Sequence, residues 1–407
     1  MEKSLETVII GGGPCGSYTA LKLAEKNIKV AVFEEHEKIG LPVHCAGHLS
    51  INGLKNLGLY PLPEEVLENI FYGAKFHSPS GKELLVKFNR PVTCVVNREK
   101  FDEHIANLAE KAGATYFLNS PVKSLIIENG KVKGVSVQRN ENKLRIMAPI
   151  TVDAEGVNAR LLRQTCLKYQ SSGALVYGFQ AEVEGVEGLD PDVVEVFLGK
   201  EYAPGFYAWL IPKKDQKANV GLATSKGNPR KLLHKLMHKH PAASSKLRKV
   251  RILRESTHPI NLGGPIPKAY SDGLLIVGDA ASHVKPTTGG GVIMGLSCAK
   301  IAADVAAEAV ENRNYTANFL SRYQKRTMTL IGFDMKIMLA IRKMLNQISD
   351  SGLDRLFDFC RKIRLEKAVR DIREIDFQGQ MIIKEMIKPS VLASAAYLFM
   401  IYCCSKH

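Results

Sequence analysis

The opening segment of the chain constrains the fold more than any other stretch. An apolar run, Thr7–Ile10, leads into the letters GGGPCG, and a second apolar run ends on Glu34. This order of strand, glycine turn, helix and acid is typical of a dinucleotide-binding unit. In such a unit, Gly11 allows the tight turn, Gly13 lets the backbone approach a pyrophosphate, and Gly16 lets the helix pack on the strand.

Glu34 and the start of the helix indicate which nucleotide would bind. A carboxylate at this position accepts hydrogen bonds from ribose hydroxyls and would repel a 2′-phosphate, which favours FAD or NAD. The helix begins at Pro14 and Cys15, where unpaired backbone N–H groups and the positive end of the helix dipole favour an anion. We therefore predict a nucleotide site that includes Cys15.

A second glycine-rich segment points to the same cofactor. An apolar strand ends on Asp279, whose carboxylate can hold a polyol hydroxyl, and a triglycine turn then starts a helix. The backbone N–H groups of Gly290, Gly291 and Val292 can face a carbonyl-rich heterocycle. Together these features describe a flavin and its ribityl chain, with an ordinary capped turn as the alternative. Arg98, at the head of another helix, adds a cation near the pyrophosphate.

Composition places the chain among globular proteins. At 407 residues and 45% apolar content it can form two or three domains with a large core. A formal charge of +15 favours anionic partners, or reflects a Lys-rich solvated surface. The eight cysteines are scattered and lack metal-ligand spacing, so we expect reduced thiols, no metal and a cytoplasmic protein.

The two ends of the chain differ in character. The N-terminus opens directly into a strand, so we expect no signal peptide there. Residues 391–404 are apolar apart from Ser394, but these 14 residues are fewer than the roughly 20 that a spanning helix requires. A docked terminal helix and a peripheral membrane contact both fit this run.

Local composition assigns two further stretches and the tail. Residues 39–50 are rich in Gly and Pro, which predicts a loop. Residues 146–153 are mostly apolar and predict one strand that ends on Asp153. From residue 316 onward the pattern is helical, with predicted breaks near Ser351-Gly352 and at Pro389.

On these motifs the chain resembles the geranylgeranyl reductase family, a branch of the flavoproteins similar in fold to para-hydroxybenzoate hydroxylase. The resemblance covers most of residues 1–330. Its most specific element is PGFYAWLIP at residues 204–212, which is similar to the family's P-x-x-Y-x-W-x-F-P signature with Ile211 where Phe is usual. Residues 43–50, VHCAGHLS, are similar to the family's Cys-containing loop beside the flavin, and residues 278–291 to its second flavin motif.

The resemblance implies an FAD-dependent oxidoreductase that saturates the double bonds of geranylgeranyl chains. Archaeal membrane lipid precursors such as digeranylgeranylglycerol phospholipids fit best as the isoprenoid substrate, with geranylgeranyl diphosphate or a chlorophyll-type chain as the alternatives. The resemblance also implies flavin contacts for Cys45, Ala46 and His48, and we assign Val122 to the same cofactor site. Cys45 is the candidate catalytic residue, as a proton source or as a redox and positioning group. Packing of this loop against the cofactor is the alternative.

Two other features bear on the substrate and its surroundings. Tyr207 and Trp209 are two residues apart, so on a strand both rings face one side and could line a slot for a long apolar chain. Ordinary core packing is the alternative. Residues 226–254 hold ten Lys or Arg and no acid, with leucines on one helical face. This basic segment suits an anionic lipid surface or a solvated helix, and it carries no nucleic-acid motif, so no nucleic acid is expected.

Other functions compete with this interpretation. A flavin monooxygenase or halogenase would share the scaffold, but Tyr207 replaces the first Trp of the W-x-W-x-I-P pattern of halogenases. A non-catalytic binder built on the basic segment is a third class. No second nucleotide cradle is visible, so the external reductant, NAD(P)H or a ferredoxin docking on the basic surface, is left unassigned.

These patterns combine into one predicted architecture. From about residue 172 to 262 apolar and polar residues alternate, which predicts a mostly antiparallel sheet. The fold class is α/β (α+β), with a Rossmann-type FAD-binding domain, a substrate-binding antiparallel-sheet domain and a C-terminal helical region. The bounds are 1–73, 96–170 and 268–330 for the discontinuous first domain, 74–95 and 171–267 for the second, and 331–407 for the helical region.

Overall fold

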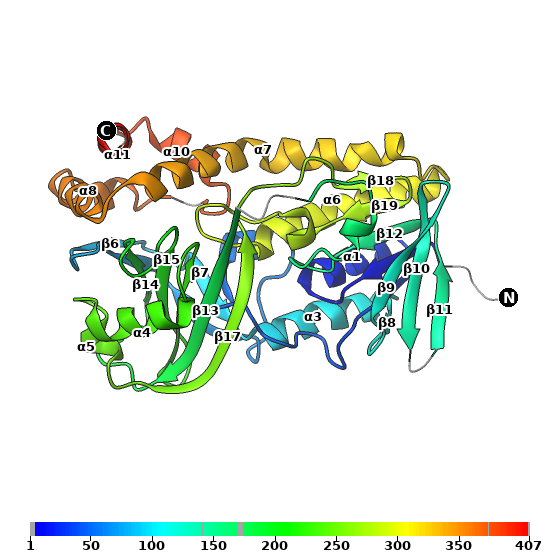
Figure 1. Ribbon diagram of the computed structural model, residues 1–407, viewed down its shortest axis with the longest axis horizontal. Helices are drawn as coiled ribbons and strands as arrows, with labels where there is room; N and C mark the ends of the chain where they lie inside the picture. Colours follow the sequence, from blue (N-terminus) through cyan, green and yellow to red (C-terminus); the bar gives the residue numbers. More distant parts are fainter. Residues whose placement is uncertain (1–4, 140–141, 170–173, 373, 406–407) are drawn as a thin grey trace. The chain divides into compact units, whose positions relative to one another are not determined.

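The computed structural model describes residues 5–139, 142–169, 174–372 and 374–405 (Figure 1). The chain forms two compact units. The first unit is Met1–Val43, Arg98–Ala174 and Asn261–Met335, and the second is His44–Asn97, Leu175–Ile260 and Lys336–His407. Residues 44–73, which we predicted in the first domain, thus group with the second unit. The predicted boundary at 170–171 lies outside the described residues, and the division by function stays a prediction.

The first unit is an α/β body. Its elements are β1 (Thr7–Ile10), α1 (Pro14–Ala24), β2 (Val30–Phe33), α3 (Arg98–Lys111), β8 (Thr115–Phe117), β9 (Val122–Glu128), β10 (Lys131–Arg139), β11 (Asn142–Met147), β12 (Ile150–Asp153), η1 (Leu162–Gln164), β18 (Tyr270–Ser271), β19 (Leu274–Ile276), η3 (Gly278–Ala281), α6 (Val292–Glu311) and the start of α7 (Ala317–Gln347). One sheet has the order β18-β19-β12-β1-β2-β8, and a smaller one the order β11-β10-β9. Helix α1 packs against both α3 and α6 (Figure 1).

The register of the larger sheet brings three strand ends together. Strands β1, β2 and β12 are buried along their whole length. Their sequences are almost entirely apolar, as expected for strands of a parallel sheet that is covered on both faces. Ile10 pairs with Phe33 on one side and with Asp153 on the other, all in parallel. The strand order reverses beside β1, and ligands of open α/β sheets bind at the carboxyl ends of strands where the order reverses.

The second unit is mostly antiparallel sheet with a helical tail. Its elements are β3 (His48–Ser50), α2 (Ile51–Asn56), β4 (Leu67–Phe71), β5 (Gly73–His77), β6 (Glu83–Lys87), β7 (Thr93–Val96), β13 (Leu175–Glu184), β14 (Val193–Leu198), β15 (Tyr207–Pro212), β16 (Lys217–Thr224), α4 (Pro229–Lys239), α5 (Ser244–Leu247), β17 (Arg251–Asn261), α8 (Asp350–Lys362), α9 (Leu365–Ala368), α10 (Gln378–Glu385) and α11 (Pro389–Cys404). The large sheet has the order β17-β13-β16-β15-β14-β5-β6, and the small one β3-β7-β4. Strand β14 pairs with β5 in parallel, whereas β13, β16, β15 and β14 pair antiparallel.

One face of the large sheet forms the core of this unit. Ala208 and Leu210 of β15 and Leu222 of β16 pack against helix residues Leu233 and Leu247, all fully or almost fully buried. The apolar face of the basic segment is therefore used inside the protein. Alternate residues of the same strands point to the opposite face of the sheet.

Two local predictions in the strands were wrong. Residues 39–50, predicted as a loop, end in strand β3, because His48–Ser50 pairs with residues 93–95, which lie far along the chain. The single strand predicted over residues 146–153 is two strands in different sheets, β11 and β12. Pro149 lies between them, and its lack of an N–H favours the break.

The tail is helical as predicted, with one break just before Ser351-Gly352 and another at Pro389, where α11 begins. Helix α7 ends at Gln347, and Ser349 then caps α8 by accepting a hydrogen bond from the Gly352 N–H at 3.1 Å. Ser351 and Gly352 therefore lie in the first turn of α8, because a serine hydroxyl at the N-cap satisfies an otherwise unpaired N–H group. Within the part of the chain that the structure describes, no single helix is both long and apolar enough to cross a membrane.

Candidate active site

The glycine turn between β1 and α1 has the geometry that a pyrophosphate site needs. Gly11 has a φ of +91°, and a Cβ there would lie 2.7 Å from the Ala154 carbonyl oxygen. A Cβ at Gly16 would collide with the carbonyl oxygen of Gly11. At Gly13, by contrast, a Cβ would meet no atom within 4 Å. The first two glycines are required by the fold, whereas Gly13 leaves open space in front of the N-terminus of α1.

Glu34 is held at this turn by the backbone. Its Oε2 atom accepts a hydrogen bond from the Gly12 N–H at 2.7 Å, and its Oε1 atom accepts one from the His36 N–H at 3.0 Å. Nδ1 of His36 lies 2.6 Å from the same Oε1 atom. The carboxylate is almost fully buried at 8% exposure, so it is fixed beside the glycine turn.

Cys15 is turned toward the interior of the first unit. Cβ atoms added at Gly278 and Gly295 would lie 2.9 and 2.6 Å from its Sγ atom, so the thiol fills the space that these glycines leave. Burial raises the pKa of the thiol, and the charge of Asp279 raises it further. We expect Cys15 to meet a nucleotide through its backbone and not through its sulfur.

Arg98 and Asp279 lie in one electrostatic neighbourhood. Arg98 opens α3, and its Nη2 atom lies 3.0 Å from both carboxylate oxygens of Asp102. Burial raises the pKa of the Asp279 carboxyl, while the charge of Arg98 acts in the opposite direction. The cation near the glycine turn and the acid that follows β19 are therefore positioned by the same unit.

The triglycine turn lies next to Asp279. Gly291 caps α6, and a Cβ added there would lie 2.9 Å from Asp279 Oδ1. Gly290 and Val292 flank it, so the three predicted residues form the N-terminus of a 20-residue helix. Such an end presents N–H groups and a positive dipole. The structure thus places the predicted polyol acceptor and the predicted N–H donors side by side.

Val122 and Asp153 lie elsewhere in the same unit. Val122 is the first residue of β9, buried and paired with Val137. Asp153 ends β12, and its Oδ1 atom accepts a hydrogen bond from the Glu155 N–H at 3.1 Å. Burial raises the pKa of Asp153 well above its ordinary value, and the charge of Glu155 adds to the effect. Neither residue has a contact that assigns it to a ligand.

The other predicted residues gather on the second face of the large sheet, in the second unit. Ala46 packs with Trp209 and Ile211 in one cluster with Phe71. The Trp209 indole Nε1 donates to Asn219 Oδ1 at 2.8 Å. The Cys45 loop and the aromatic strand, predicted from distant segments, are thus brought together.

Cys45 and His48 have different surroundings within that loop. Cys45 is exposed, and its Sγ atom accepts from the Gly47 N–H at 3.4 Å. The ring of His48 lies 2.7 Å from Thr93 Oγ1 through Nε2 and contacts Phe71 edge-on. Cys45 therefore presents its thiol outward, whereas the contacts of His48 anchor the loop to β7 and β4.

Tyr207 and Trp209 form the aromatic pair that their spacing predicts. Their ring centroids are 6.0 Å apart with an interplanar angle of 68°, and Tyr207 also stacks on Phe206. A Cβ at Gly221 would lie 2.5 Å from the Trp209 ring, so this glycine makes room for the indole. Burial raises the pKa of the Tyr207 hydroxyl, while the charge of Arg342 lowers it.

Sequence comparisons then decide the family. A family model described as lycopene cyclase protein matches residues 6–359. Digeranylgeranylglycerophospholipid reductase 2 of Methanothermobacter thermautotrophicus is 34% identical over 359 residues, which cover 86% of this chain and 90% of that protein. The chain belongs to the digeranylgeranylglycerophospholipid reductases, in the lycopene cyclase protein family. A reductase of the same name from Methanopyrus kandleri is 30% identical over 399 residues, covering 97% of this chain and 99% of that protein.

Solved structures confirm the predicted fold of this reductase. The geranylgeranyl bacteriochlorophyll reductase-like protein of Thermoplasma acidophilum has a TM-score of 0.86 at 27% identity, covering 97% of this chain and 99% of that one. A flavin-dependent brominase has a TM-score of 0.69 at 19% identity and covers 99% and 94%, so it shows the fold alone. The predicted family and the predicted class, an oxidoreductase on a flavoprotein fold, are confirmed. The halogenase alternative rests on the shared fold.

Gln180 is a residue of this reductase that the sequence analysis missed. Its Nε2 atom donates to the His44 carbonyl oxygen and to Ser256 Oγ, both at 3.1 Å. The ring of His44 also stacks on His258 at 5.2 Å. The sequence shows only an amide side chain in an alternating strand, on the side opposite Ala181, and the structure shows that this amide is buried. Its partner on the Cys45 loop is 136 residues away, so the pairing was not visible in the sequence.

We predict that Gln180→Ala loosens the Cys45 loop. The variant removes the N–H donor of the His44 carbonyl, which we expect to lower the free energy of unfolding by about 1 to 2 kcal/mol and turnover by about tenfold. Hydrogen exchange at residues 45–47 should become faster. Gln216→Ala, an exposed glutamine in the same unit, is the matched control. Unchanged exchange in the loop of the Gln180 variant would contradict the assignment.

We predict opposite effects of Asp279→Asn on stability and on cofactor binding. A raised folded-state pKa means that the contribution of Asp279 to stability is present at low pH and is lost as the pH rises through that pKa. The asparagine does not ionise, so the apo variant should gain stability relative to the native chain as the pH rises above the ordinary carboxyl pKa of about 4. FAD affinity should fall about tenfold, because a charged acceptor is lost. Chemical denaturation and flavin titration measure the two effects, and equal destabilisation at all pH values would contradict the first.

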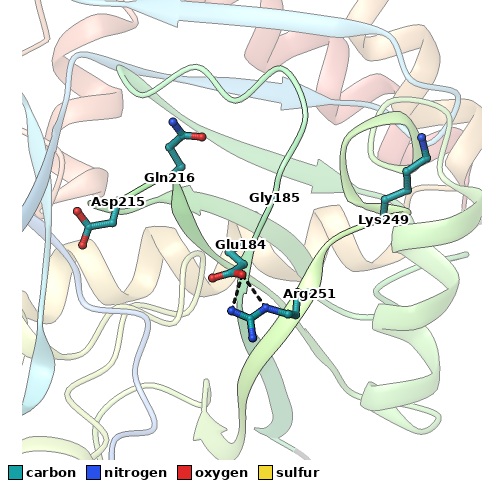
Figure 2. A pocket seen from close by; sticks show the side chains of 6 residues that line it. All are labelled: Glu184, Gly185, Asp215, Gln216, Lys249 and Arg251. Atoms are coloured by element: carbon teal, nitrogen blue, oxygen red, sulfur yellow. Dashed lines mark hydrogen bonds and ion pairs between the residues drawn. The ribbon is translucent and has the colours of Figure 1, made fainter.

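An open hollow lies apart from these residues. Figure 2 shows its lining, and its volume is about 490 Å³. Arg251 Nε donates to Glu184 Oε1 at 2.6 Å across it. The lining residues are Glu184, Gly185, Asp215, Gln216, Lys249 and Arg251, none of which belongs to the predicted site.

Proposed function

We propose that this reductase binds FAD and saturates the carbon–carbon double bonds of geranylgeranyl chains, with a digeranylgeranylglycerol phospholipid as substrate. The observation that carries the proposal is the 34% identity, over 90% of its length, to a digeranylgeranylglycerophospholipid reductase. The predicted dinucleotide residues of the first unit support it independently of that name.

The residues of the first unit fit FAD. The open space at Gly13 admits a pyrophosphate beside the N-terminus of α1, and the charge of Arg98 acts on Cys15 in the first turn of that helix. Glu34, already fixed by the Gly12 N–H, has the chemistry to accept from ribose hydroxyls. Asp279 and the N-terminus of α6 would hold the polyol chain and the ring carbonyls. These groups match the anionic, hydroxylated and carbonyl-rich parts of one cofactor.

Reduction of an isolated alkene needs a hydride at one carbon and a proton at the other. When bound and reduced by an external donor, the flavin would supply the hydride. We assign the proton to the exposed Cys45 thiol, and we assign Tyr207 and Trp209 to the apolar chain that must be oriented and kept from water. Gln180 keeps the Cys45 loop in place through the His44 carbonyl.

Two reductants fit this function. NAD(P)H would deliver hydride during a transient visit, and an acidic ferredoxin would be attracted by a chain with a net charge of +15. Rapid mixing of oxidised enzyme with each donor separates them, since only the true donor bleaches the flavin within the turnover time.

Flavin loading and reoxidation test the proposed function. The purified chain should be yellow or take up FAD, and anaerobic addition of a digeranylgeranylglycerol phospholipid should reoxidise the reduced flavin. A saturated phospholipid of the same head group is the control and should leave it reduced. A chain that takes up no flavin, or reduced flavin that is indifferent to the unsaturated lipid, would refute the proposal.

A further inference from the structure

The last helix of the chain is apolar on two faces, and only one of them is packed. Helix α11 has no charged residue between its first and last positions. On one face Ile401 is buried with Leu353, and Tyr397 stacks on Phe359 with ring centroids 4.2 Å apart. This face docks the helix on α8, which leaves the opposite face to be explained.

The opposite face is an exposed apolar stripe. Leu392, Phe399 and Met400 lie on it with exposed fractions of 50%, 58% and 51%. Their spacing of seven and eight residues places them on one side of a helix. Ile383 and Ile387 precede the helix at 49% and 85% exposure, four residues apart. We call these five side chains the apolar face, and an exposed set of this kind marks an interaction site in soluble proteins.

Positive charge flanks the apolar face. The stretch 361–370 includes helix α9, which contacts α11. Its exposed charged side chains are all basic, and its one acid, Glu366, is half-buried. The exposed side chains are Arg361, Lys362, Arg364, Lys367 and Arg370. We call them the cationic segment. A second copy of this chain on the same face would bring two cationic segments together, whereas an anionic lipid surface would be attracted.

In helix α4, another basic helix of this unit, the apolar side is buried. Leu233, Leu236 and Met237 are buried in the core against the large sheet. Helix α4 and the tail therefore differ in kind, because the apolar side chains of α4 are buried, whereas the tail has exposed apolar side chains beside exposed cations.

We propose that α10 and α11 lie in the plane of an anionic bilayer, with the apolar face at the acyl chains and the cationic segment at the head groups. Helix α11 has 16 residues, about 24 Å in length, which is shorter than the roughly 30 Å of a hydrocarbon core. It forms an angle of 114° with α10, so the pair is not one straight span. The inference deepens the proposed function and rests on it, because the proposed lipid substrate resides in the bilayer.

Vesicle flotation of the full chain loaded with FAD tests the inference. The probes are vesicles of phosphatidylglycerol and phosphatidylcholine in equal parts, and vesicles of phosphatidylcholine alone. We expect the native chain to bind the anionic vesicles. The double variant Ile387→Glu/Phe399→Glu should bind them at least about tenfold more weakly, since two charges replace buried apolar contacts. Ile127→Glu, at a 41% exposed isoleucine of β9 in the first unit, is the matched control and should bind like the native chain.

A second variant and two readouts keep the outcomes separate. Arg364→Glu/Lys367→Glu should weaken binding to anionic vesicles about tenfold or more, and added salt should weaken binding of the native chain. Native binding by the Ile387/Phe399 variant would overturn the inference, as would a dimer in light scattering that this variant dissociates without loss of vesicle binding. Turnover of detergent-dispersed substrate reports on the proposed function separately, because it needs no bilayer.

Discussion

Alanine at Gly13 is expected to lower FAD affinity at least tenfold while leaving the folded chain intact. Apart from its chain neighbours, a Cβ at this position meets no atom of the described residues within 4 Å, and the φ of −65° is one that any residue adopts. Its only conflict would be with a ligand that approaches the backbone in front of α1. A loss of that close approach is worth more than 1.4 kcal/mol, which is tenfold in affinity. Flavin titration and thermal unfolding of the apo chain measure the two expectations.

Gly16→Ala provides the contrast to this variant. Its Cβ collides with the Gly11 carbonyl oxygen, so we expect both flavin binding and apo stability to fall. If Gly13→Ala bound FAD like the native chain, the pyrophosphate would not lie at this turn. If it unfolded like Gly16→Ala, the open space in front of α1 would be wrong.

Cys45→Ser is expected to slow turnover by about 100-fold or more while FAD stays bound at native affinity. General acid groups contribute about 10² to 10⁴ in rate, and the serine hydroxyl is a far weaker acid than the thiol. Within the described residues, the Cys45 Sγ atom has one hydrogen bond, which it accepts from the Gly47 N–H, so the substitution disturbs little of the loop. Single-turnover flavin reoxidation with the unsaturated lipid measures the effect.

Cys166→Ser is the matched control for Cys45, because Cys166 is also an exposed cysteine. It should reoxidise at the native rate. Full turnover by the Cys45 variant would end the catalytic assignment and leave this loop a packing role.

The parts of the site that could be predicted from the sequence are those that one short segment specifies. The turn before α1 needs Gly11 at positive φ and no side chain at Gly16, and both glycines belong to one short stretch of sequence. The aromatic pair on β15 follows from strand alternation in the same way.

The missed features depend on contacts between distant segments. Strand β3 exists because it pairs with β7, and Gln180 matters because His44 lies against it. The inward orientation of the Cys15 thiol depends on Gly278 and Gly295, more than 260 residues away in sequence. No local sequence pattern predicts these contacts, because each residue is compatible with its own helix, strand or loop whether or not the distant partner is present.

Mass spectrometry of the lipid product tests the central claim most directly. Chemically reduced enzyme is incubated without oxygen with a digeranylgeranylglycerol phospholipid. The lipid is then extracted, and its mass is compared with that of lipid incubated without enzyme. The account predicts a gain of two hydrogens for every double bond that is saturated. A lipid of unchanged mass, recovered from enzyme that carries fully reduced FAD, would contradict it.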